Sequence, residues 1–203
     1  MAAVGIMKTV RNPGGPYFRL IASAVLAVAL FLFVTSLASA KNGEVESILR
    51  GAYGETLVGE AQGIVGSLEL DDEEVVHFRE TVDVFREQGF PARSCLDYVN
   101  LAYGLNKADI SLEDLAYKVR EGVAKGATPD RVMVVINDRV GWLKSARVVV
   151  LSLENEGVDF LDKQMSYRVL ADYLARGVSP DELSTQVLKR DLGDYPALEN
   201  VIR

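Results

Sequence analysis

Few side chains in this sequence of 203 residues have the type and spacing that catalysis or metal binding requires. His77 is the only histidine and Cys95 the only cysteine. A cysteine nucleophile needs a basic partner, and a zinc site needs several nitrogen or sulfur ligands. We expect His77 to be a solvated residue near Glu73 and Glu80, and Cys95 to be a buried apolar side chain. The alternatives for Cys95 are a nucleophile or an intermolecular disulfide.

Two acidic stretches could attract a cation, namely DDEE at 71–74 and ENEGVD at 154–159. Neither has the alternation of acidic residues and glycine that a calcium loop uses. A helix N-terminus accounts for the first stretch and a turn between helices for the second. The phosphate-binding, metalloprotease, C-x-x-C and G-x-S-x-G patterns are also absent from the sequence. We therefore assign no catalytic, cofactor-binding or metal-ligating residue and expect no cofactor.

The segment KGATPDRV at 125–132 returns as RGVSPDEL at 176–183. In the first copy, Gly126 suits the left-handed residue that closes a helix. Thr128 can cap the next helix through its hydroxyl, and Pro129 takes the first helical position, where a missing N–H is harmless. The second copy repeats each role, so the repeated segment is interpreted as helix punctuation and not as a binding site.

The elements around these segments are predicted to be helices. A side chain three residues after a cap can return a hydrogen bond, which predicts capping boxes at Asp71 with Glu74, Ser111 with Asp114, and Ser179 with Glu182. Apolar residues recur at helical spacing, and the β-branched runs VMVVI and RVVVLSL follow a helix start. We predict an all-α bundle of about six or seven amphipathic helices in antiparallel hairpins. The predicted ranges are 71–88, 91–104, 111–125, 128–155, 158–176 and 179–190.

Residues 41–70 precede this helical domain, which is expected to span 71–203. The part GAYGETLVGEAQGIVGSL places an apolar stripe on one side of a helix and three glycines on the other. Glycine disfavours a helix by up to about 1 kcal/mol per position relative to alanine. We expect either a flexible tether or a weak helix that becomes ordered on a partner.

The first forty residues predict export. Lys8, Arg11 and Arg19 precede an uncharged apolar run, 20–34, and small residues then lead to Ala40. This is the layout of a secretory signal peptide cleaved after Ala40. The alternative is an uncleaved anchor formed by 20–40. Either way, the positive charges before the run place the rest of the chain outside the cytoplasm, in the periplasm or extracellular medium, or tethered to the inner membrane.

The charge balance disfavours nucleic acid as a partner. Residues 1–40 hold three of the 22 Lys and Arg and none of the 29 Asp and Glu, which leaves 19 against 29 and a net charge of −10 for 41–203. An acidic domain repels phosphate backbones. Membrane contact is expected only through 20–40, if that run is not cleaved.

The recurrent order of helix, Lys/Arg-Gly-x-Ser/Thr-Pro-Asp and helix resembles that of exported bacterial proteins of unknown function. These are built from helical hairpins after a signal peptide. The resemblance covers about 71–190 and rests on capping chemistry. It implies an all-α fold and no particular activity.

Two functions are compatible with the sequence. The first is a non-catalytic exported module that binds a protein or another envelope component through a groove between helices. The alternative is an envelope enzyme, a glycan-directed hydrolase or lyase, that uses one or two carboxylates. A deep cleft with a buried carboxylate beside a tyrosine would favour the enzyme, and the tyrosines in question are Tyr98, Tyr103, Tyr167 and Tyr173.

Overall fold

The computed structural model describes residues 43–202, which belong to one compact unit. The predicted all-α class is confirmed for these residues, whereas the leader at 1–40 lies outside them. None of the described helices has both the length and the apolar character needed to cross a membrane. After a helical stretch at 43–53, the helices are α2 Glu55–Val65, α3 Asp72–Glu87, α4 Ala92–Asn106, α5 Glu113–Ala124, α6 Pro129–Asn155, α7 Lys163–Ala175 and α8 Pro180–Lys189, followed by the 3-10 helix η1 Leu198–Asn200.

The repeated segments are helix boundaries, as predicted. Thr128 and Ser179 each cap the following helix by accepting a backbone N–H three residues later. Gly126 and Gly177 precede them with φ of 69° and 91°, a conformation that glycine adopts without steric cost. The capping box at Asp71, the start of α3, is also present in full. Local hydrogen bonding therefore explains these residues without a ligand.

Two predicted capping boxes are wrong, for related reasons. Helix α5 has no side-chain cap, and Ser111 instead accepts the N–H of Glu113 at 3.2 Å. The side chain of Asp114 binds a buried arginine from another helix. At α8, Glu182 accepts the hydroxyl of Tyr195 at 2.6 Å. In both cases the acidic side chain binds a residue distant in sequence, so it does not return a hydrogen bond to the backbone of the cap residue.

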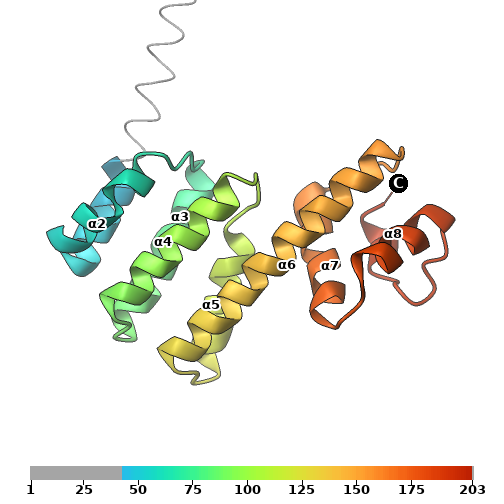
Figure 1. Ribbon diagram of the computed structural model, residues 1–203. Helices are drawn as coiled ribbons and strands as arrows, with labels where there is room; N and C mark the ends of the chain where they lie inside the picture. The colour runs from blue at the N-terminus through green and yellow to red at the C-terminus, as the bar shows by residue number, and fades with distance from the viewer. Residues whose placement is uncertain (1–42, 203) are drawn as a thin grey trace, which may run out of the picture. The chain divides into compact units, whose positions relative to one another are not determined.

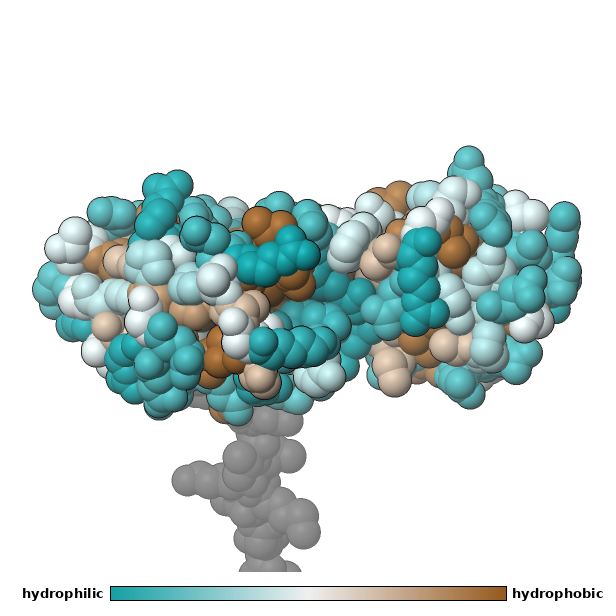
Figure 2. All heavy atoms as spheres, turned by 90° about the horizontal axis from the view of Figure 1, so that it is seen from below, coloured by the Kyte–Doolittle hydropathy of each residue, from teal (hydrophilic) through white to brown (hydrophobic). Residues whose placement is uncertain are grey.

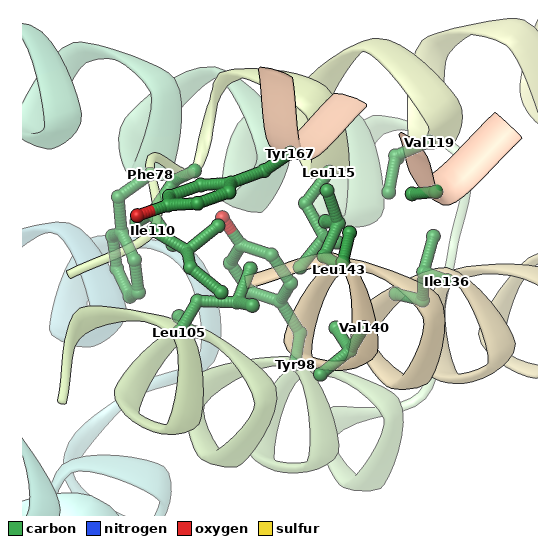
Figure 3. Packing of buried hydrophobic residues seen from close by; sticks show 14 of the residues in the cluster. Phe78, Tyr98, Leu105, Ile110, Leu115, Val119, Ile136, Val140, Leu143 and Tyr167 are labelled. Atoms are coloured by element: carbon green, nitrogen blue, oxygen red, sulfur yellow. The ribbon is translucent and has the colours of Figure 1, made fainter. Parts of the chain in front are cut away.

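Among the described residues, the helices follow one another across the molecule from α2 to α8 (Figure 1). Helix α3 packs on α5, α4 on α6, and α6 on both α7 and α8. Helix α6 has 27 residues and contacts four other helices, which explains why its valine-rich runs form helix and not strand. In the centre of the core, Tyr98 of α4, Leu143 of α6 and Tyr167 of α7 gather in one apolar layer (Figure 3).

Residues 43–53 and 55–65 are helical and packed, so the described part of this segment is a helix, one of the two predicted alternatives, and not a flexible tether. The predicted stripe is buried, with Leu57 at 3% and Ala61 at 0% exposure, while Gly59 and Gly63 are exposed. Helix α2 packs on α4, and this contact offsets the weak helix propensity of the glycines. The compact unit therefore includes this segment and does not begin at residue 71.

The segment after α8 folds back over α7. Phe160 pairs with Ile202 in an isolated antiparallel bridge, and the N–H of Leu161 donates to the carbonyl of Val201 at 3.0 Å. This extended pairing explains why α7 begins at Lys163 and not at residue 158 as predicted. Five apolar side chains of the returning segment are buried: Leu192, Tyr195, Leu198, Val201 and Ile202.

Cys95 is fully buried, as predicted, and burial raises the pKa of its thiol to about 12. Because its pKa is raised, the thiol stays protonated at pH 8 and is a poor nucleophile. Because it is buried, it is also inaccessible to reagents. We expect no labelling of the native protein by iodoacetamide at pH 8, and one label per chain after unfolding in guanidinium chloride. Mass spectrometry measures both states, and rapid labelling of the native chain would contradict the packing described.

Candidate functional site: an apolar groove between α5, α6 and α7

A groove with a volume of about 380 Å³ opens between α5, α6 and α7. Figure 2 looks onto the end where α5 leads into α6 and shows a surface indented between this end and the α7–α8 side. We call this site the apolar groove. Its apolar lining is Gly122, Ala127, Val132, Val135, Trp142 and Ala175, and its charged lining is Lys118, Glu121, Lys125, Arg131, Arg139 and Asp172.

Helical periodicity places these residues together. On α6, Arg131, Val135, Arg139 and Trp142 are spaced i, i+4, i+8 and i+11, so they form one row along the helix. Val135 is 37% exposed and Trp142 is partly buried. On α5, a Cβ at Gly122 would lie 3.0 Å from the Val132 side chain, so glycine permits this close approach of α5 to α6.

The base of the groove is an ion cluster around Arg139, whose side chain is only 5% exposed. Its Nε and Nη2 donate to the two carboxylate oxygens of Asp114 at 2.5 and 3.2 Å, and Nη1 donates to Asp172 at 2.7 Å. Burial favours the neutral guanidine, but the bonds and charges of Asp114 and Asp172 outweigh it and raise the pKa of Arg139. This cluster connects α5, α6 and α7 and holds the walls of the groove in place.

The rim of the groove carries excess positive charge. Lys118 and Lys125 both bind Glu121, at 2.8 and 2.5 Å, and these hydrogen bonds lower the pKa of Glu121 to about 2. Arg131 is exposed and has no ion-pair partner within 43–202. The lining has four cationic and two anionic side chains, hence +2, or +1 when Asp114 behind Arg139 is included. The whole chain, in contrast, carries −7.

A larger cavity of about 770 Å³, the acidic cleft, lies where α3, α5 and α7 begin. Most of its carboxylates already have partners inside the protein. Asp71 and Glu74 form the capping box, Glu113 pairs with Arg168, and Asp162 caps α7. Burial raises the pKa of Glu74 above its ordinary value. Within the described residues, no group of three or more His, Cys, Asp or Glu side chains is placed to hold a metal ion.

The structure places His77 differently from the prediction of a solvated residue. Its side chain is 15% exposed, and its Nε2 and Nδ1 lie 3.9 and 3.8 Å from carboxylate oxygens of Glu73 and Glu80. The proximity to these two glutamates is as predicted. The predicted solvation of His77 is wrong. Helix α5 packs on α3, and Arg120 of α5 reaches across to Glu80 on the same side of α3.

The other singled-out residues lie apart from both cavities. The stretch 154–159 is a turn with Gly157 at φ 87°, and Glu154 pairs with Lys163 at 2.8 Å. The tyrosines proposed as partners of a catalytic acid line neither the apolar groove nor the acidic cleft: Tyr98, Tyr103, Tyr167 and Tyr173.

The sequence did not predict that the residues of the apolar groove form a site. Trp142 lies within the predicted helix 128–155, but no role was predicted for it. The available signal was the row on α6, in which two arginines alternate with a valine and the only tryptophan of the chain. Trp and Arg are enriched among the residues that contribute most to binding at protein interfaces, so such a row indicates a binding surface.

Comparison with known proteins gives no match to a family model, a curated protein or a solved structure. The function must therefore be inferred from the chemistry of the apolar groove and the acidic cleft.

Proposed function

We propose that the protein is an exported, non-catalytic helical module that binds another protein through the apolar groove. The observation that carries this proposal is a preformed hollow in which Trp142 and Val135 stand beside cationic side chains. Pockets of roughly 300–1,000 Å³ with mostly apolar walls and a few fixed polar groups are typical binding sites. The groove is at the lower end of that range and suits one or two side chains of a partner.

Export and the hairpin arrangement are parts of the same proposal. The basic residues, apolar run and small residues of 1–40 support a cleaved signal peptide, with an anchor at 20–40 as the alternative. Short connections and the packing of α3 on α5 and α4 on α6 support antiparallel hairpins stacked in a row. Stacked hairpins commonly bind partners in the grooves between helices.

The carboxylate enzyme is the weaker proposal. Its acid would be Glu74, whose pKa is raised by burial in the acidic cleft. However, a Glu74 oxygen already accepts the N–H of Asp71 at 3.3 Å, and the only buried carboxylate, among 43–202, is Asp114, which binds Arg139. Release of soluble fragments from cell-wall glycan by the purified protein, lost in Glu74→Gln, would favour the enzyme instead.

Filling the groove should abolish partner binding without unfolding the protein. Ala175 is exposed and lines the groove, whereas Ala124 is exposed and lies outside it. In pull-down from an envelope extract, we expect Ala175→Phe to lose the specifically captured protein at least about tenfold, equivalent to 1.4 kcal/mol. Ala124→Phe should capture it like the unaltered protein.

Two substitutions that make a side chain polar without enlarging it test the same site. Val135 and Val134 are neighbours on α6 with 37% and 49% exposure, and only Val135 lines the groove. Val135→Ser is expected to weaken capture, and Val134→Ser to leave it unchanged. Equal effects of the two serine variants, or capture that survives Ala175→Phe, would show that the partner binds elsewhere.

A further inference from the structure

Resting on the proposed function, we infer that the groove receives an acidic peptide segment, in which two or more carboxylates lie to one side of a large apolar side chain. The inference deepens the proposal by naming the chemistry of the partner. It follows from the charge of the groove, the order of its residues and its size.

The charge of the rim selects an anionic partner. Lys118 and Lys125 share the single carboxylate of Glu121, which leaves one positive charge uncompensated. Arg131 adds a second, since it has no ion-pair partner in the described part of the chain. The chain as a whole is acidic, so the charge of the groove has the opposite sign to the net charge of the protein. Such complementarity governs partner choice and association rate.

The order of residues along the groove predicts which part of the peptide binds at each end. Lys125 and Arg131 flank the turn between α5 and α6, so they lie at one end of the groove. Trp142 is three helical turns further along α6 than Arg131, a distance of roughly 16 Å. Val135 lies between them. The carboxylates of the peptide therefore bind at the turn, and the apolar side chain packs against Val135 and Trp142.

The groove does not suit a cationic partner. Arg139 is already bound to Asp114 and Asp172, and the side chain of Asp172 is 54% exposed. A cationic peptide would be repelled by Lys118, Lys125 and Arg131, whereas the charge of Asp172 is already compensated by Arg139. A second copy of this chain is a less suitable occupant, because two chains of charge −7 repel each other.

Selection from a displayed library of random 12-residue peptides tests the inference. The targets are the protein as purified from an exporting host and its Ala175→Phe variant, with Ala124→Phe as the matched control. Peptides enriched on the first and third targets but not on the second are specific to the groove. We expect them to share Asp or Glu residues beside one Leu, Phe or Trp.

Enriched peptides without tryptophan are then titrated against the fluorescence of Trp142, the only tryptophan of the chain. We expect Arg131→Glu and Lys125→Glu each to weaken binding at least tenfold, and binding to weaken as salt rises. Lys144→Glu makes the same charge change on an exposed residue of α6 outside the groove and should bind normally. Circular dichroism checks that each variant is folded.

The outcomes separate the inference from the function on which it rests. Peptides that depend on the groove but are neutral or basic, or that bind Arg131→Glu normally, overturn the acidic partner and leave the binding module intact. The absence of any groove-dependent peptide overturns both. Concentration-dependent dimerisation that is lost in Ala175→Phe would make a second copy the occupant and also overturn the acidic peptide.

Discussion

Replacing Arg139 by alanine is expected to lower the free energy of unfolding by about 3–5 kcal/mol, the usual loss when one partner of a buried ion pair is removed. The variant leaves Asp114, a residue only 8% exposed, without the guanidinium that binds both of its oxygens. A buried carboxylate without a partner is costly, because neither water nor a cation then compensates its charge. Urea unfolding followed by circular dichroism measures the change.

Two further variants separate burial from charge. Asp172→Ala should cost less, on the order of 1 kcal/mol, because exposed ion pairs contribute little, and the Asp172 side chain is 54% exposed. The double variant Arg139→Leu with Asp114→Leu removes both charges, and it should lie close to the unaltered protein in stability. A loss below about 1 kcal/mol for Arg139→Ala alone would contradict the importance of the buried pair described here.

The second large effect concerns α2, in the segment for which the sequence predicted either a flexible tether or a weak helix. We expect Leu57→Ala to destabilise the protein by about 2–5 kcal/mol, the range for truncating a buried leucine. Leu57 is 3% exposed and belongs to the common core. A leucine in a flexible tether would contribute nothing to the unfolding transition, so the same urea experiment distinguishes the two descriptions.

The glycines of α2 provide the matched control. Gly59 is exposed within the helix, and a Cβ there would meet no atom within 4 Å. Gly59→Ala should therefore raise stability by up to about 1 kcal/mol through helix propensity alone. If Leu57→Ala and Gly59→Ala both left the transition unchanged, α2 would not be part of the cooperative unit.

Much of the helical organisation was predictable because its signals are local. Caps such as Thr128 and glycines such as Gly126 act within a few residues, so their roles can be read from short segments. The all-α class followed from the same signals. The start of α7 was not predictable, since Phe160 is held out of the helix by Ile202, some forty residues later.

The candidate site was less predictable, because it depends on residues brought together by packing. Asp114 fits a capping box by spacing, yet the structure uses it to bind Arg139 of the next helix. The solvation of His77 was misjudged because periodicity identifies the face of a helix but not whether a neighbour covers it. Trp142 lay on the correct helix, but the groove around it also needs α5 and α7.

The returning segment after α8 has a consequence for assembly. In rows of stacked helices, the last unit exposes an apolar side on which a further unit could be added. Here Tyr195 packs edge-on against Tyr173 with ring centroids 5.0 Å apart, and Ile202 occupies the backbone edge beside Phe160. The returning segment therefore covers part of the α7 surface on which a further unit could pack. Filament growth by end-to-end addition at α7 would have to displace this segment first.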